Sequence, residues 1–385
     1  MDFTLNEEQE MIRDVVHTFV ENEIHPRAGD LDRRGEFPLA LLGEMGDMGM
    51  LGMLVPEEFG GAGSDTLTQA IVVEELAGSF ASLSLIVAVH AWLGIYPILR
   101  FGTPAQKARF LPKMATGEHL GAMAMTEPAA GSDPLAITTT AVRSGDHYLL
   151  NGTKIFISNG SRSAHPIVIA ATDKSHGARS LSAFIVERGT SGFSTGTREE
   201  KLGMHCADTA ELIFQDCAVP LENLLGTEGD GLKIALSALD HGRIGIGAQA
   251  TGIATGALRA SVTYARERKQ FGKPIGAFQG VSFPMADMAT RIDAARLLVY
   301  RAATLADTPG AHFGTQAAMA KLFASEVAME CTSRAIQIHG GYGYTLDYPV
   351  ERYFRDAKVT EIYEGTSEIM RIVIARSLLG REFSS

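Results

Sequence analysis

The sequence of 385 residues contains little cysteine, a single tryptophan and no excess of positive charge. Its three cysteines, Cys206, Cys217 and Cys331, form no CxxC pair and have none of the spacings of a metal-binding motif. We therefore expect reduced, buried thiols and no metal site. The net charge of -11, with no basic stripe along the chain, argues against nucleic acid as a partner.

Long hydrophobic runs are missing as well. No apolar stretch approaches the roughly 20 residues that a membrane-spanning helix needs, so we expect no membrane partner. The N-terminal segment MDFTLNEEQEM is acidic and helix-like, unlike a signal or transit peptide. These features predict a cytoplasmic protein, or one of the mitochondrial matrix if a leader has been removed.

With 45% hydrophobic residues, the chain can bury a large core and divide into two or three domains. Its first third has helical periodicity. Thr4 and Glu7 have the spacing of a capping box, and the apolar face from Ile12 to Val20 predicts a helix that Pro26 ends. Further helices are expected at 37–50, 66–80, 82–100 and 104–116.

The pattern changes near residue 121. Short β-type runs follow at 138–142, 148–150, 154–158, 166–171, 182–186 and 210–214, and Asn151-Gly152 predicts a hairpin turn. Long helical patterns return at 232–268, 278–305, 315–338 and 366–379. The sequence thus predicts an α+β fold with an N-terminal α-helical domain (1–120), a middle β domain (121–227) and a C-terminal α-helical bundle (228–385).

The segment IYEGTSEIMR, residues 362–371, contains the most informative carboxylate. Glu364 precedes Gly365, which lets backbone approach a ligand, and Thr366 and Ser367 can cap the helix that follows. Burial beside such a helix raises the pKa of a carboxyl group towards working pH and makes it a competent base. The helix would pack an apolar face inward, made of Ile369, Ile372 and Val373.

Four more motifs accompany this segment: MAMTEPAAGSD (123–133), RKQFGKPIGAFQ (268–279), QIHGGYGY (337–344) and YPVERYFRDAK (348–358). Together they resemble, in order, the signature motifs of the acyl-CoA dehydrogenases, and the resemblance runs nearly end to end. It implies an α domain, a β-barrel and a C-terminal four-helix bundle. It also implies that Glu364 removes the α proton of an acyl-CoA while FAD accepts the β hydride, that an electron-transfer flavoprotein takes the electrons, and that the enzyme is a homotetramer.

A redox cofactor is required for such chemistry because no side chain accepts a hydride. The sequence has no GxGxxG following a strand. Gly242, Gly245 and Gly247 lie inside a helical pattern, where tight helix packing is the simpler interpretation. The missing nicotinamide fingerprint favours a flavin held by another fold.

The resemblance assigns the flavin contacts to five groups of residues. They are Met123, Met125, Thr126, Gly131 and Ser132; Phe156, Ile157 and Ser158; Arg268, Phe271 and Gln279; Gln337, Ile338, Gly340 and Gly341; and Thr366, Ser367 and Glu368. The Arg268 group would reach the ADP half across a subunit interface. Without the resemblance, TEPAAGS is an ordinary surface turn and Arg268 a solvated helix charge. Phe156 stands where most relatives have tryptophan, so it keeps an aromatic face but lacks an N–H donor.

Substrate contacts are implied for Ser132, Asp240, Arg243 and Gly365. Read alone, Asp240 and Arg243 are three residues apart on a helix and could form a simple surface pair. Some relatives place their base at the position of Gly242, so glycine there leaves Glu364 as the one plausible base. His241 and His339 also lie in motifs, where structural or solvent-facing roles are the alternative to proton transfer.

Chain-length preference has the weakest signal. Leu85, Ile86 and Val89 share one helix face that closes the acyl pocket in relatives, and branched side chains there favour short or branched substrates; the alternative is ordinary core packing. The sequence therefore predicts an FAD-dependent acyl-CoA dehydrogenase for short or branched chains. Two alternatives remain: an acyl-CoA oxidase or enoyl-CoA reductase on the same scaffold, and a non-catalytic flavin or acyl-CoA-binding protein.

Overall fold

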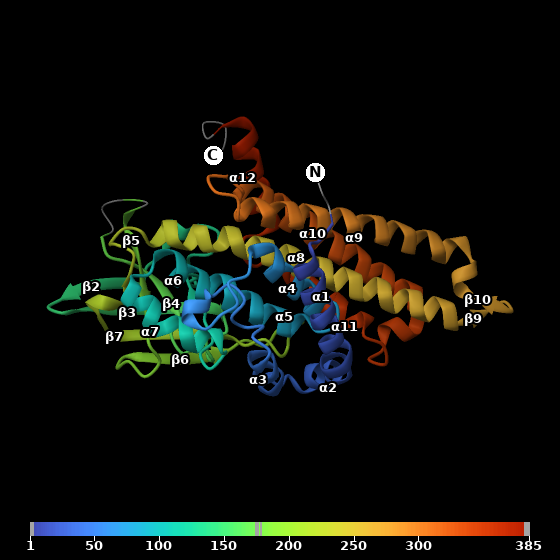
Figure 1. Ribbon diagram of the computed structural model, residues 1–385, viewed down its shortest axis with the longest axis horizontal. Coiled ribbons are helices and arrows are strands. Elements are labelled where there is room, and N and C mark those ends of the chain that lie inside the picture. The colour runs from blue at the N-terminus through green and yellow to red at the C-terminus, as the bar shows by residue number, and fades with distance from the viewer. Residues whose placement is uncertain (1–3, 174–176, 178, 381–385) are drawn as a thin grey trace.

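The structure, a computed structural model, describes residues 4–173, 177 and 179–380. A β-sheet forms one end of the elongated molecule, and a bundle of long helices, one of which begins beside the sheet, extends to the opposite end (Figure 1). The predicted fold class, with helical N- and C-terminal parts around a middle sheet, is confirmed.

The N-terminal part is helical throughout, and two local predictions in it were wrong. Its capping box joins Asn6 to Gln9, not Thr4 to Glu7: Gln9 N donates to Asn6 Oδ1 at 2.8 Å and Asn6 N donates to Gln9 Oε1 at 3.2 Å. Pro26 does not end the helical path, because it lies in the first turn of α2, after a π-helical segment. The bounds are α1 Glu7–Phe19, η1 Val20–Ile24, α2 His25–Arg34, α3 Leu39–Asp47, α4 Thr66–Ala77 and α7 Pro104–Ala115.

One helical path, made of α5 (Ala81–Ala88), the π-helix η3 (Val89–Ile95) and α6 (Tyr96–Phe101), is long and apolar enough to cross a membrane by length and composition. The prediction that no stretch reaches that length was therefore wrong. Within the protein, however, 89% of this stretch is buried. It has the position of a core helix, and its apolar surface packs against the neighbouring helices.

The middle sheet follows the order β6-β7-β3-β2-β4-β5-β8, with β1 beside β4. Asn151-Gly152 does not form the predicted hairpin, because both residues lie inside one continuous strand, at a register shift opposite β7. The turn is instead at 145–146, since Ser144 pairs with His147. The bounds are β1 Met123–Ala124, β2 Thr140–Ser144, β3 His147–Ser158, β4 Ile167–Ala171, β5 Leu181–Ile185, β6 Phe193–Arg198, β7 Thr209–Pro220 and β8 Leu224–Leu225.

The C-terminal part contains the long helices that the sequence predicted and one, α11, that it did not. The bounds are α8 Gly231–Glu267, α9 Gln279–Ala306, α10 Gly314–His339, α11 Val350–Val359 and α12 Ser367–Leu379, with a short hairpin of β9 (Lys269–Gln270) and β10 (Lys273–Pro274) after α8. The predicted inward face of α12 was wrong: Met370 is fully buried, while Ile372 is 37% exposed.

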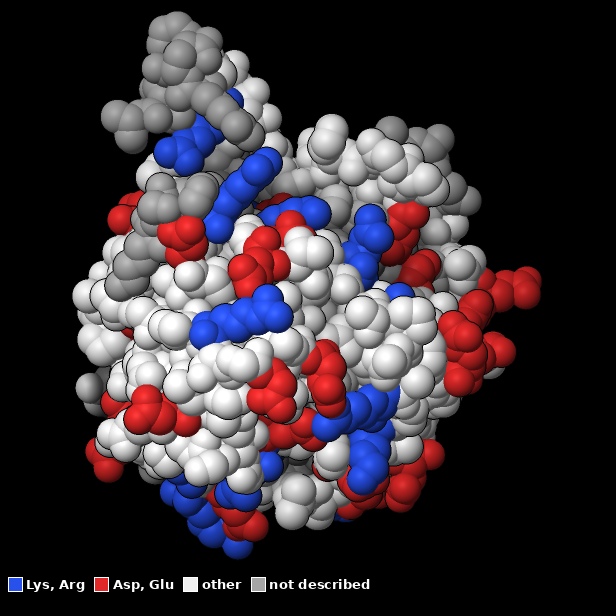
Figure 2. All heavy atoms as spheres, turned by 90° about the vertical axis from the view of Figure 1, so that its left-hand side faces the viewer, with Lys and Arg blue, Asp and Glu red and all other residues white. Residues whose placement is uncertain are grey.

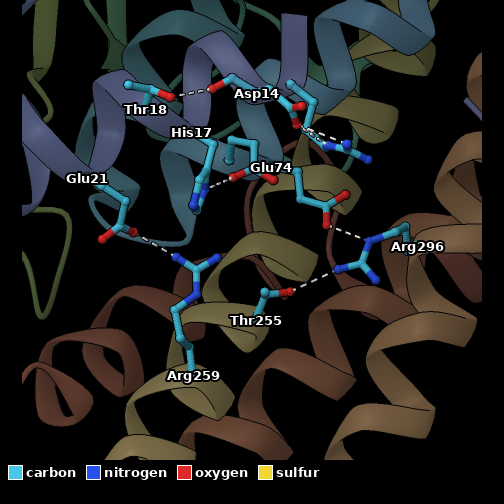
Figure 3. A network of polar contacts seen from close by, with 10 residues as sticks. Asp14, His17, Thr18, Glu21, Glu74, Thr255, Arg259 and Arg296 are labelled. Atoms are coloured by element: carbon cyan, nitrogen blue, oxygen red, sulfur yellow. Dashed lines mark hydrogen bonds and ion pairs between the residues drawn. The ribbon is translucent and has the colours of Figure 1, made fainter. Parts of the chain in front are cut away.

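A polar network fastens the N-terminal helices to α8 and α9 (Figure 3). Arg296 Nε donates to the buried carboxylate of Glu74 at 2.7 Å, and its Nη2 donates to Thr255 Oγ1 at 3.2 Å. Nearby, Arg259 Nη1 donates to Glu21 Oε1 at 2.9 Å. The buried carboxylate of Glu74 needs a charged partner, so its contact with Arg296 fixes α8 and α9 against the N-terminal helices.

Charges are mixed on the end of the molecule that carries the sheet, where basic and acidic side chains are interspersed (Figure 2). The three cysteines are free and buried, as predicted. Burial raises the pKa of each thiol, to about 12 for Cys206 and Cys331 and about 11 for Cys217. They therefore behave as small apolar side chains.

Candidate active site

Glu364 lies in the turn between α11 and α12, and its position depends on that turn. Thr366 caps α12 as predicted, with Oγ1 accepting a hydrogen bond from Ile369 N at 3.3 Å. The backbone turns through left-handed conformations at Glu364 (φ 52°) and Gly365 (φ 99°). A non-glycine residue at positive φ is uncommon, and here it directs the carboxylate towards α8.

The Glu364 carboxylate occupies the space left by Gly242 on α8. A Cβ atom at Gly242 would lie 1.9 Å from Glu364 Oε2, so only glycine leaves room for it. Oε2 is buried and has no hydrogen-bond partner among the described residues. Burial raises the pKa of Glu364 to about 7, although the positive charges of Arg243 and Lys321 oppose this rise.

The three glycines of the GxxGxG run confirm the packing interpretation. Besides Gly242, a Cβ at Gly245 would lie 2.3 Å from Trp92 Cζ3, and one at Gly247 would lie 2.9 Å from Val299 Cγ2. All three positions are inside α8. Close packing of neighbouring side chains, rather than a dinucleotide turn, explains these glycines.

Arg243 and Asp240 form an ion pair, with Nη1 to Oδ1 at 2.5 Å, but not a surface pair. The Arg243 side chain is 7% exposed, whereas that of Asp240 is 32% exposed. Arg243 Nε is buried and lacks a partner in the described part of the chain. Arg243 therefore has an unused buried donor, while the Asp240 side of the pair is open to solvent.

Two residues next to Glu364 were not singled out from the sequence. Lys321 on α10 is fully buried, and its Nζ donates to the Gly365 carbonyl at 2.8 Å. Tyr363 donates its hydroxyl to Gln249 Oε1, and Gln249 is itself held by Ser84 Oγ at 2.8 Å. A lone lysine in the apolar stretch AAMAKLFA was the available signal for the first; nothing in the sequence distinguished the second.

His241 and His339 have structural positions. His241 Nδ1 lies 3.0 Å from Ser237 O and its ring packs 4.0 Å from that of Tyr96. His339 Nδ1 lies 2.8 Å from Ala335 O, and its ring stacks on Tyr264. Burial lowers the pKa of both histidines, so both are neutral near pH 7 and packed away from solvent.

The loop of residues 123–132 is anchored by a buried ion pair. Lys154 Nζ donates to Glu127 Oε1 at 2.8 Å and to Met125 O at 2.9 Å, and both charged side chains are essentially unexposed. Glu127 also accepts from Thr138 N at 2.7 Å and Thr139 N at 3.0 Å. Burial alone would raise the pKa of Glu127, but these hydrogen bonds bring it to about 2. Such anchoring is more than an ordinary surface turn requires.

The end of β3 lies beside this loop. Ile155 N donates to Thr126 O at 2.9 Å, and Phe156, at φ 57°, is 59% exposed at a register shift. One residue past β3, Asn159 Nδ2 donates to Ile86 O at 3.0 Å on α5. The structure thus brings two predicted flavin segments together against the helix that flanks α8. The members of these segments are Met123, Met125, Thr126, Gly131, Ser132, Phe156, Ile157 and Ser158.

Thr366, Ser367 and Glu368 lie at the start of α12, next to Glu364, whereas the predicted flavin residues of 268–279 and 337–341 lie elsewhere. Arg268 stacks over the ring of Tyr342 at 5.5 Å, which joins the segment 268–279 to the loop that follows α10. Phe271 is 93% exposed. At 1.5 Å per residue, α8 carries the chain about 39 Å from Gly242 to Arg268. The two groups are therefore at opposite ends of the C-terminal bundle and do not meet within one chain (Figure 1).

The residues present fit a flavin dinucleotide in their chemistry. Ser367 Oγ at the start of α12 is buried without a partner among the described residues. A Cβ at Gly131, Gly340 or Gly341 would meet no described atom within 4 Å, so a ligand can approach the backbone closely at these positions. Hydroxyls, accessible backbone and exposed aromatic rings are the groups that hold flavin rings and phosphates.

Comparison with known proteins gives consistent results. Three family models match in succession: the acyl-CoA dehydrogenase N-terminal domain at residues 6–118, the middle domain at 122–217 and the C-terminal domain at 229–379.

Two curated relatives and one solved structure illustrate the similarity. The short-chain specific acyl-CoA dehydrogenase of Clostridium acetobutylicum is 48% identical, over 97% of this chain and 99% of its own. The acryloyl-CoA reductase (NADH) of Anaerotignum propionicum is 50% identical, over 99% and 97%. A solved structure concerning the electron transferring flavoprotein of Acidaminococcus fermentans contains a chain that is 52% identical, with a TM-score of 0.97, over 98% of this chain and 100% of that one.

Proposed function

The chain belongs to the acyl-CoA dehydrogenase family, and we propose that it oxidises short or branched acyl-CoA thioesters with Glu364 as the catalytic base. It is an FAD-dependent oxidoreductase of the CH–CH class. Bound FAD supplies the acceptor for the hydride that leaves the β carbon, and the product is the trans-2-enoyl-CoA.

The observation that carries the assignment is the environment of Glu364. Its Oε2 is buried and has no hydrogen-bond partner among the described residues. It lies against Gly242, whose missing side chain leaves room for the carboxylate. A pKa of about 7 means that a substantial fraction is ionised at neutral pH, while the carboxylate stays basic enough to remove a weakly acidic proton.

The chain's own residues would divide the work as follows. Glu364 Oε2 takes the α proton, and the pair of electrons left on the α carbon forms the new double bond as the β hydride departs. Arg243 and Lys321 keep a positive potential beside the carboxylate, which limits the rise in its pKa. The buried surroundings exclude water, so the proton cannot exchange with solvent before the hydride leaves.

The flavin contacts remain a proposal in two parts. The loop with Thr126 and Ser132, together with Phe156 and Ser158, would hold the ring system near Glu364. The distal groups of Arg268, Phe271 and Gln279, and of Gln337, Ile338, Gly340 and Gly341, would hold the ADP half of a cofactor bound by a second copy. This arrangement requires an oligomer, and we propose a homotetramer of chains divided at 1–120, 121–227 and 228–385.

Partners and location follow from the family. An acyl-CoA substrate and an electron-transfer flavoprotein partner fit it. We propose that the latter reoxidises the flavin of this chain, and that Ser132, Asp240, Arg243 and Gly365 contact the substrate. A cytoplasmic location also stays a proposal.

A second candidate is the reverse reaction, reduction of a short enoyl-CoA. The relative named acryloyl-CoA reductase (NADH) is as similar to this chain as the dehydrogenases are. The same residues serve in both directions, because Glu364 protonated at pH values below about 7 can return the α proton. The two directions are distinguished by comparing the rate of butyryl-CoA oxidation with the rate of crotonyl-CoA reduction. The second assay uses a chemically reduced flavoprotein as the electron donor.

The test of the proposed function is flavin bleaching in the purified holoenzyme with a panel of straight and branched acyl-CoAs. We expect bleaching with short or branched chains, and oxygen consumption no faster than in a control without acyl-CoA. Glu364→Gln should bind FAD normally but bleach at least about a thousandfold more slowly. Bleaching of that variant at the wild-type rate would refute the assignment of the base, and no bleaching with any thioester would indicate a non-catalytic binding protein.

A further inference from the structure

The change in exposure along α8 indicates the direction in which an acyl chain would enter the candidate site. Asp240, on the turn before Gly242, is partly open to solvent, whereas the helix is buried from His241 to Ala254. A thioester whose polar part lies at Asp240 and Arg243 must therefore direct its acyl chain along α8, past Gly242 and into the protein.

Gly242 and Gly245 are one helical turn apart and share a face of α8. The Glu364 carboxylate occupies the space at the first glycine, and the indole of Trp92 occupies the space at the second. A Cβ at Gly245 would lie 2.3, 2.5 and 3.2 Å from Trp92 Cζ3, Cε3 and Cη2, all atoms of the six-membered ring. The base and the indole are thus adjacent along one inward path.

Trp92 is held firmly in this position. It is fully buried in η3, and the neighbouring Gly94 lies so close to Gly121 that a Cβ there would be 2.6 Å from its Cα. The helix that carries the indole therefore cannot move away from α8 towards the sheet. Ile86 lies on α5 and Val89 begins η3, so both belong to the same helical path as Trp92 and are buried with it.

We propose that the indole of Trp92, seated against Gly245, is the end wall of the acyl pocket and restricts this enzyme to short acyl chains. The three residues from Gly242 to Gly245 rise about 4.5 Å along α8, which leaves room for only a few methylene groups beyond the carbon whose proton Glu364 removes. The inference rests on the proposed function and names the residue that sets its chain length.

The decisive experiment replaces the indole with smaller side chains. In the FAD-loaded enzyme we expect wild type to favour butyryl-CoA over octanoyl-CoA in kcat/KM. Trp92→Leu should raise the octanoyl-to-butyryl ratio at least tenfold, and Trp92→Phe should extend the range only to hexanoyl-CoA. An unchanged ratio in both folded, yellow variants, or a wild type that prefers octanoyl-CoA, would overturn the inference.

Two glycine variants of α8 provide a matched pair. Gly245→Ala places a methyl group against the indole and should push it into the pocket, which raises the KM for butyryl-CoA severalfold. Gly247→Ala meets Val299 on another side of the helix, so it should affect stability but leave the chain-length ratio at the wild-type value. A ratio that changes equally in both variants would contradict a specific role for Trp92.

Because Trp92 is the only tryptophan of the chain, its emission gives an independent readout. The non-oxidisable thioether S-butyl-CoA should change the tryptophan emission of wild type on binding, and CoA without an alkyl chain should not. Equal responses to both compounds would count against contact between the acyl chain and the indole. If wild type shows no flavin bleaching with any acyl-CoA, the proposed function itself fails; if it bleaches but the ratios stay constant, only the role of Trp92 fails.

Discussion

At the scale of single residues, the site depends on two things missing around Glu364: a side chain on the adjacent helix and a hydrogen-bond partner for its carboxylate. The carboxylate is adjacent to a glycine that provides no side chain, and Oε2 has no partner among the described residues. A base made in this way is unstable in its charged form, because burial without hydrogen bonds disfavours the ion.

The pH dependence of the free energy of unfolding should reveal this unfavourable ionisation. Since burial raises the folded-state pKa of Glu364 from 4.5 to about 7, the folded state retains the proton more strongly, and stability falls as the pH rises between these values. Glu364→Gln removes the ionisation, so at pH 8 it should unfold at a higher temperature than wild type. The corresponding gain in the free energy of unfolding is roughly 2 to 4 kcal/mol. The difference should shrink towards pH 5, as measured by thermal unfolding at each pH. A gap that is constant with pH would contradict a raised pKa.

Lys321 should set the working pH range of the base. The groups that face Glu364 are the cations of Arg243 and Lys321, and Lys321 also faces Glu361 and Glu368. Lys321→Met removes one cation, so the pKa of Glu364 should rise further. The ascending limb of the kcat/KM profile should then shift to higher pH, with activity lost at pH 7 and partly recovered at pH 9.

The control for this shift is a lysine outside the site. Lys113→Met removes an exposed lysine paired with Glu118 and should leave the profile unchanged. If Lys321→Met lowers activity by the same factor at every pH, the lysine acts only through the carbonyl of Gly365 and not through its charge.

Sequence reasoning identified Glu364 from the residues around it, whereas the family resemblance singled out Gly242 and the Asp240–Arg243 pair. It did not identify Lys321 or Tyr363, whose relation to the base depends on how α10 and α8 pack. Burial also could not be deduced from spacing: the same three-residue interval fits both a surface ion pair and the buried arginine that the structure contains.

At the scale of elements, glycine and proline were the least reliable signals. Asn151-Gly152 resembles a hairpin turn, but Gly152 lies against Thr139, where a Cβ would be 2.3 Å from Oγ1. The dipeptide therefore marks a strand irregularity rather than a chain reversal. Long helices were predicted well, since their periodicity persists over many residues, whereas short elements such as β6 and α11 were missed.

The flavin loop gives a prediction at this scale. Lys154→Met leaves the Glu127 carboxylate buried without its cation, which should reduce the free energy of unfolding by about 3–5 kcal/mol. Because Lys154 also holds Met125 O, FAD should dissociate at least tenfold more readily, as measured by flavin release on dilution.

The matched comparison is the double variant Lys154→Met/Glu127→Gln. It removes the uncompensated charge and should regain part of the lost stability while FAD binding stays weak. If the double variant is no more stable than Lys154→Met, the destabilisation comes from lost packing instead of an unpaired carboxylate.

At the scale of the whole molecule, α8 separates two half-sites. Its turn at Gly242 faces the base, and its last residues lead to Arg268, which stacks on Tyr342. Sequence motifs identified both ends, yet their separation of about 39 Å becomes visible only when α8 is a single unbroken helix. The exposure of Phe271, at 93%, is further reason to expect that this end of the bundle is covered by something outside the chain.

Mixed oligomers test whether a second copy supplies the distal half. Consider two inactive variants, Glu364→Gln, which lacks the base, and Arg268→Ala/Phe271→Ala, which would lack the contacts to the ADP half. If each cofactor is shared between copies, some sites in a mixed oligomer combine Glu364 from the Arg268→Ala/Phe271→Ala chain with Arg268 and Phe271 from the Glu364→Gln chain. Such sites are intact. Co-expressed variants with different affinity tags, purified through both tags, should therefore recover up to about half of the wild-type activity per chain. If each chain binds its cofactor alone, every site carries one defect, and the mixed oligomers should be as inactive as the separate variants.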